Sequence, residues 1–90
     1  MKWFADYIDD LKEKLEITSD YAIAKHLGIE RQNITRARNG EPLNDKICFR
    51  IASELKINPM EIIATAKAQK EKNNDIRALW IKLAKESGNR

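Results

Sequence analysis

Residues 19–40, SDYAIAKHLGIERQNITRARNG, decide the fold of this 90-residue chain. Apolar side chains recur at helical spacing on both sides of Gly28, so each side predicts one short helix. Gly28 stands between the two because glycine enters left-handed backbone geometry without a Cβ penalty. Asn39 and Gly40 form a strong stop signal for the second helix. The stretch therefore predicts two helices joined by a tight turn, a helix-turn-helix.

The second helix, predicted over residues 31–38, has one apolar and one polar side. At roughly 100° per residue, Ile34 and Ala37 lie opposite an arc of polar residues: Arg31, Gln32, Thr35, Arg36 and Asn39. In the major groove, Arg can donate two hydrogen bonds to guanine, Gln can pair with adenine, and Thr can meet thymine. The arc therefore predicts direct contacts with bases. A solvated surface helix of a non-binding bundle is the alternative.

The flanking sequence predicts further helices and no strands. Residues 3–16 repeat apolar side chains at helical spacing, and Thr18 or Ser19 can cap the next helix. Asn44 or Asp45 can cap a fourth helix, whose apolar stripe consists of Ile47, Ile51 and Leu55. A fifth helix is expected to start at Asn58–Pro59, with Glu61 at the capping-box position. Residues 67–74 are polar and predict either a frayed helix or a hinge.

A sixth helix is expected from Asp75 onward. Its apolar residues are Ile76, Leu79, Trp80 and Leu83. Two Trp residues exceed what so small a core easily covers, so these four are candidates for a dimer interface. Two recognition helices on half-sites about 34 Å apart overcome the weak binding of a single one. We therefore expect a homodimer.

The distribution of charge is more informative than the net charge of +3. Residues 1–20 hold three lysines and six carboxylates, whereas residues 21–56 hold seven basic and four acidic residues. Three arginines and no carboxylate lie between Arg31 and Gly40. This local basic segment suits an anionic partner.

Other classes of function find little support in the sequence. Cys48 is the only cysteine and His26 the only histidine, so we expect no disulfide and no metal site. No apolar run reaches transmembrane length, and carboxylates near the amino terminus interrupt any signal-peptide pattern. We therefore expect a cytoplasmic protein that is not an enzyme and has no cofactor or small-molecule ligand.

Residues 21–40 resemble the helix-turn-helix of the Cro/cI-type, lambda repressor-like phage regulators. The likeness continues over residues 46–63, where Ile51–Leu55 and Ile57–Pro59 resemble the last two helices of that five-helix domain. More narrowly, the chain resembles small regulators encoded by filamentous prophages. The resemblance implies an all-α, five-helix domain over residues 1–66, with residues 67–90 added as a helical extension.

Carried over by position, the resemblance implies base contacts from Arg31, Gln32, Thr35 and Arg36. It also implies phosphate contacts near Ser19, Tyr21 and Asn39. Further phosphate contacts are expected from four basic residues: Lys25, Arg38, Lys46 and Arg50.

The first position of the motif departs from the family pattern. The family usually has Gln there, whereas this chain has Asp20, which a phosphate would repel. We expect Asp20 to act as an orienting residue by pairing with Arg31 and holding its guanidinium for guanine.

The sequence thus predicts a transcriptional regulator, a repressor that binds a palindromic duplex operator as a dimer. The same fold could serve an excision factor, an activator or an antitoxin, and the sequence does not separate these. A protein-docking module that never meets DNA is an alternative from another class.

Overall fold

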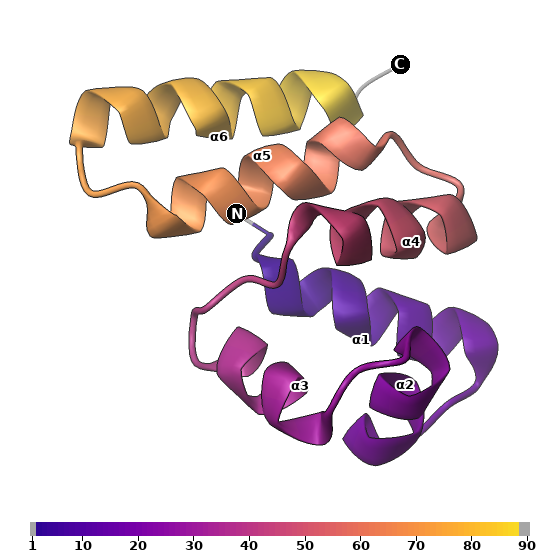
Figure 1. Cartoon of the computed structure of the whole chain (residues 1–90). Helices are drawn as coiled ribbons and strands as arrows, with labels where there is room; N and C mark the ends of the chain where they lie inside the picture. The colour runs from indigo at the N-terminus through magenta and orange to yellow at the C-terminus, as the bar shows by residue number, and fades with distance from the viewer. Residues whose placement is uncertain (1, 89–90) are drawn as a thin grey trace.

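The computed structural model describes residues 2–88, which form six α-helices and no strand (Figure 1). The predicted all-α class is confirmed over these residues. The helices are α1 (Phe4–Leu15), α2 (Asp20–Leu27), α3 (Arg31–Arg38), α4 (Asp45–Leu55), α5 (Pro59–Lys70) and α6 (Asn74–Gly88).

Three helices begin at side chains that cap them as predicted. Ser19, Asn44 and Asn58 each accept a hydrogen bond from a backbone N–H of the first turn, at 3.1, 3.0 and 2.9 Å. Ser19 rather than Thr18 therefore caps α2, and Asn44 rather than Asp45 caps α4. Each cap satisfies an amide that the helix itself leaves without a partner.

Glu61, expected to complete a capping box at the start of α5, has a different role. Its carboxylate accepts a hydrogen bond from the Tyr7 hydroxyl of α1 at 2.5 Å. Burial, together with this hydrogen bond, raises the pKa of Tyr7 well above its usual range, so the phenol remains a donor. The residue thus joins α5 to α1 instead of closing its own helix end.

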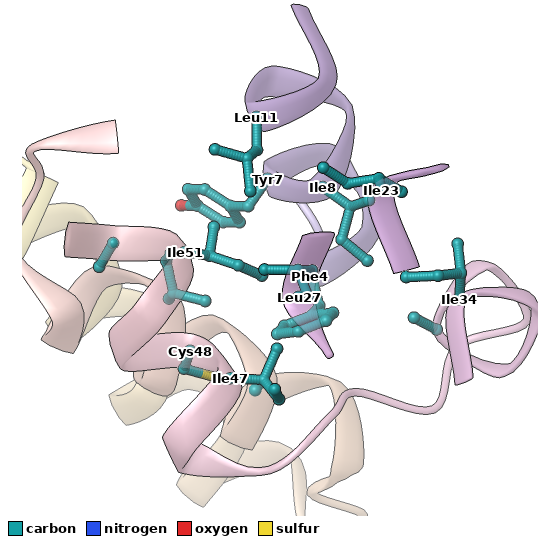
Figure 2. Packing of buried hydrophobic residues seen from close by; sticks show 14 of the residues in the cluster. Phe4, Tyr7, Ile8, Leu11, Ile23, Leu27, Ile34, Ile47, Cys48 and Ile51 are labelled. Carbon is teal, nitrogen blue, oxygen red and sulfur yellow. The ribbon is translucent and has the colours of Figure 1, made fainter. Parts of the chain in front are cut away.

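The hydrophobic core draws side chains from α1 to α5, and Figure 2 labels those of α1 to α4. Phe4, Ile8 and Leu11 of α1 are completely buried, and they meet the apolar sides of the neighbouring helices. The largest buried partners are Ile23, Leu27, Ile34, Ile47, Ile51 and Ile62. At about 25 cal/mol per Å² of apolar surface, this burial is the main favourable contribution to folding.

Helix α5 is covered on more than one side. Ile62 and Ala66 belong to the main core, while Ala64 and Ala68 are also completely buried. Figure 1 shows α6 lying along α5, on the side away from α1. The small alanine side chains let α6 approach closely, and only Met60, Lys67 and Lys70 of α5 remain exposed.

The boundary expected after residue 66 falls inside a helix. Helix α5 continues past Ala66 to Lys70, and Gln69 near its end accepts a hydrogen bond from the backbone N–H of Phe4 at 2.6 Å. The guanidinium of Arg77 in α6 lies 5.5 Å from the centre of the Trp3 ring. These contacts tie the extension to the first helix.

The polar stretch after α5 is part helix and part short link. Residues 71–73 connect α5 to α6, and Asn73 accepts hydrogen bonds from the backbone N–H groups of Asp75 and Ile76 at 2.9 and 3.1 Å. The stretch predicted as either frayed helix or hinge is therefore helical as far as Lys70 and non-helical over residues 71–73. Asn73 then caps the start of α6.

Replacing Gly28 by Ala should lower the free energy of unfolding by about 1–2 kcal/mol. Gly28 has a φ of 72°, and an added Cβ would meet nothing within 4 Å, so the cost is conformational rather than steric. Lys56, which has a φ of 59° at the end of α4, provides the matched opposite case. Lys56→Gly should leave stability unchanged or raise it by up to about 1 kcal/mol. Urea unfolding measures both, and a loss of stability in Lys56→Gly equal to that in Gly28→Ala would contradict this account.

Candidate nucleic-acid interface

The turn between α2 and α3 is closed by backbone hydrogen bonds. Gly28 donates to the carbonyl of Lys25 at 3.1 Å, and Ile29 donates to that of Ala24 at 3.0 Å. Both bonds satisfy carbonyls at the end of α2, which is possible because Gly28 adopts left-handed geometry. The start of α3 is therefore fixed relative to α2.

Two buried side chains determine which side of α3 faces outward. Ile34 is completely buried and Ala37 is 1% exposed, whereas Arg31, Gln32, Thr35 and Arg36 are all exposed. The structure thus places the four predicted base-contacting residues on the free side of α3. We call these four residues the α3 arc.

The cations of the α3 arc are not neutralised within the described chain. Neither Arg31 nor Arg36 takes part in an ion pair among residues 2–88. Thr35 makes only a long contact of 3.4 Å from its hydroxyl to the Arg31 carbonyl. All four side chains therefore remain available to an external partner.

Arg38, predicted to contact phosphate, is instead held by two carboxylates. Its Nε and Nη2 atoms donate to Asp20 at 2.9 and 2.8 Å, and Nη2 also donates to Asp9 at 2.8 Å. Lys12 adds a third cation–carboxylate contact, to Asp20 at 2.9 Å. We call Asp9, Lys12, Asp20 and Arg38 the ion-pair cluster. It links α1, α2 and the last turn of α3.

The expected pairing of Asp20 with Arg31 is wrong. Both carboxylate oxygens of Asp20 accept from Arg38, because Arg38 lies on the side of α3 that faces α1 and α2. The hydrogen bonds from Arg38, and then that from Lys12, hold the pKa of Asp20 well below its usual range despite opposing burial. Asp20 thus orients the whole helix rather than one guanidinium.

The other predicted phosphate contacts fall into two groups. Lys25 and Lys46 are exposed and form no ion pair among residues 2–88, and Asn39 is exposed at the end of α3. Arg50, in contrast, donates to the carbonyl of His26 at 2.7 Å and to the Glu54 carboxylate at 3.3 Å. Arg50 is therefore a weaker candidate than the two lysines.

A shallow hollow brings three of the predicted residues together. It lies between α2 and the start of α3 and is lined by Tyr21, Ala24, Lys25, Ile29, Glu30 and Arg31. Tyr21 is 64% exposed, so its hydroxyl is accessible beside two cations. Ser19, at the nearby start of α2, uses its oxygen as a cap acceptor, which leaves its O–H free to donate.

The contribution of Asp9 and Lys12 was not predictable from the sequence. Helical spacing places Asp9 on a solubilising face of the first helix, but it holds Arg38 from 29 residues away. No local spacing signals such a contact, because it depends on how α1 and α3 pack. The pair of Glu54 and His26, joined at 2.6 Å between α4 and α2, was missed for the same reason.

Other kinds of site lack support in the part of the chain that the structure describes. Among residues 2–88, no group of three side chains could hold a metal ion, and no helix is long and apolar enough to cross a membrane. Cys48 is buried, and burial raises the pKa of its thiol to about 12, so the reactive thiolate is disfavoured at neutral pH.

Comparisons of the chain with protein-family models, with curated proteins and with solved structures find no match. The arrangement of the α3 arc and the ion-pair cluster therefore carries the functional argument by itself.

Replacing Asp20 by Asn should lower the free energy of unfolding at pH 7 by about 1–2 kcal/mol, because it weakens charge-assisted hydrogen bonds from Arg38 and Lys12. The pKa of Asp20 is lowered in the folded state, so its contribution is present above the unfolded pKa of about 4 and is lost as the pH falls below it. The difference from the unsubstituted protein should therefore shrink toward pH 2.

Urea unfolding between pH 7 and pH 2 measures this difference. Glu41→Gln is the matched control, since Glu41 is exposed and forms no ion pair among residues 2–88. It should change stability by less than about 0.5 kcal/mol. An Asp20→Asn effect that is equally large at both ends of the pH range would show that the carboxylate charge is not what stabilises the protein.

Proposed function

We propose that this protein is a sequence-specific regulator of transcription that binds duplex DNA through α3. The observation that carries the proposal is the α3 arc: four exposed side chains, two of them arginines without an ion-pair partner among residues 2–88, on a helix whose other side is buried. If this side of α3 were only solvated, nothing would favour leaving its two guanidinium groups unpaired in a chain that contains many carboxylates. The major groove of DNA, in contrast, is lined by acceptor atoms that unpaired guanidinium groups can donate to.

The chemistry of the α3 arc suits bases in the major groove. Arg31 and Arg36 can each donate two parallel hydrogen bonds to the O6 and N7 of guanine. Gln32 can pair with adenine, and Thr35 can place its methyl group against thymine. Four residues within one and a half turns reach a few neighbouring base pairs, which is the usual span of one recognition helix.

Phosphate contacts would come from the rim of the same surface. Lys25 and Tyr21 lie beside Arg31 in the hollow between α2 and α3, and Ser19, Asn39 and Lys46 flank it along the chain. The ion-pair cluster contributes indirectly, because it fixes α3 against α1 and α2 before DNA arrives. Preorganisation of this kind reduces the entropy lost on binding.

The resemblance of residues 21–40 and 46–63 to lambda repressor-like regulators favours a more specific form of this proposal. It is a phage or prophage repressor with a five-helix domain, acting in the bacterial cytoplasm as a homodimer on a palindromic operator. The order of α1 to α5 along the chain is compatible with that arrangement.

Arg36→Ala should weaken binding to the preferred duplex by about 1–3 kcal/mol and relax the preference at one base pair. Binding to random-sequence duplex should change much less, since the lost contacts are to base edges. Fluorescence anisotropy with both duplexes measures the two affinities.

Lys85→Ala is the control for Arg36→Ala, because it removes one positive charge from α6, at the end of the molecule away from α3 (Figure 1). It should affect both duplexes slightly and equally. Equal losses on both duplexes in Arg36→Ala would refute the base-contacting role. Failure of the unsubstituted protein to retard any duplex would favour the docking-module alternative.

Lys46→Ala should reduce the slope of log affinity against log salt concentration by about 1, with little change in sequence preference. Each phosphate contact releases roughly one counterion, and Lys46 is exposed at the start of α4 without an ion-pair partner among residues 2–88. Arg38→Gln should leave the slope nearly unchanged, because the charge of Arg38 is already balanced by Asp9 and Asp20. A larger slope change in Arg38→Gln than in Lys46→Ala would reverse these assignments.

A further inference from the structure

Helix α6 keeps an apolar stripe outside the folded chain. Ala84 is buried against α5, while Ile76, Leu79 and Leu83 are 44%, 67% and 36% exposed. The three exposed residues stand at spacings of three and four, so they form one stripe along the helix. Within residues 2–88, α6 packs against α5 with its other side, and the three side chains stay exposed, so this stripe has no partner there.

The charges beside the stripe follow a definite pattern. Asp75 and Lys82, seven residues apart, carry opposite signs on the same flank of the stripe, and Glu86 lies on that flank too, with its carboxylate 4.0 Å from the Lys82 ammonium. The other flank contains Trp80 and Ser87, both half-buried and without charge. The stripe is therefore apolar along its length and charged along one edge only.

We propose that the occupant of this stripe is a second copy of the chain, with the two α6 helices packed antiparallel about a two-fold axis beside Leu79. Ile76 lies three residues before Leu79 and Leu83 four residues after it. Reversing one helix about Leu79 thus sets Ile76 against the partner's Leu83, and Leu79 against the partner's Leu79. A two-fold interface needs such a self-complementary surface.

The charged flank is self-complementary in the same register. Asp75 lies four residues before Leu79 and Lys82 three after it, so Asp75 comes level with the partner's Lys82, and symmetry repeats the pair. In antiparallel helices, the same flanks face each other across the apolar seam. A parallel pair would instead bring this flank against the uncharged side of Trp80 and Ser87, leaving Asp75 without a cross-helix partner and Lys82 with only Glu86 of its own helix.

This inference deepens the proposed function, and its relevance to operator binding rests on that function. Its physical basis is separate, because the stripe on α6 shares no residue with the α3 arc, and Figure 1 shows α6 at the top of the view and α3 at the bottom. Dimer formation can therefore be measured in the absence of DNA. A protein that dimerises without binding DNA would contradict the proposed function but not the dimer. A monomer that still selects a duplex would contradict the dimer but not the proposed function.

The register is tested by mixing two charge-reversed variants. Asp75→Lys gives a flank with two lysines and Lys82→Asp a flank with two aspartates, so each variant alone sets like charges opposite each other. We expect each to dissociate at least about tenfold more readily than the unsubstituted protein. Mixed in equal amounts, they should form a heterodimer of nearly the original affinity, because both pairs become opposite in sign.

Sedimentation equilibrium over the micromolar range measures all four samples, with circular dichroism confirming that each variant stays helical. A monomeric unsubstituted protein, or a mixture that associates no better than its components, overturns the proposal. The mixture also controls for damage to α6 by either substitution, since a helix-disrupting change would not be rescued by the other variant.

Cysteine cross-linking tests the position of the axis. Leu79→Cys should form a disulfide-linked dimer readily under mild oxidation, because the two copies of residue 79 face each other. Ala78→Cys is the matched control, exposed and adjacent but off the stripe, and it should cross-link far more slowly. Cys48 is buried and does not interfere. Equal cross-linking of the two variants would contradict an axis beside Leu79.

Discussion

The burial of Ile34 and Ala37 is the constraint on which the presentation of α3 depends. An eight-residue helix makes too few backbone hydrogen bonds to be stable alone, so it persists only through what its apolar side contacts. Those two side chains face the core of α1 and α2, and the helical period then forces Arg31, Gln32, Thr35 and Arg36 outward. The exposure of the candidate interface is thus a direct consequence of burying the opposite side of α3.

Arginines of α3 have different environments although they are close in sequence. Arg38 is held by Asp9 and Asp20, whereas Arg31 and Arg36 have no ion-pair partner among residues 2–88. The same residue type therefore fixes the helix at its end and supplies free donors along its outer side. The acidic amino-terminal segment contributes to this division, because Asp9 balances Arg38 and leaves the charge of the arc undiminished.

Local signals in the sequence predicted most of the helix boundaries, and non-local contacts account for the differences. Ser19, Asn44 and Asn58 were predictable as caps because each acts on an amide two or three residues away. The pairing of Asp20 was mispredicted because its partner, Arg38, is 18 residues distant and is brought near only by the turn at Gly28. The exposure of the α3 arc was predictable from periodicity, since the opposite side had to be buried.

Selection of bound duplexes from a random-sequence library tests the central claim most directly, because the protein itself then chooses the sequence among all those offered. If α3 contacts base edges, successive rounds should enrich one short sequence, and the Arg31→Ala variant should enrich a sequence relaxed at one position. If two copies bind together, the enriched sequence should be palindromic. A library that stays random after selection by the folded protein would contradict the account.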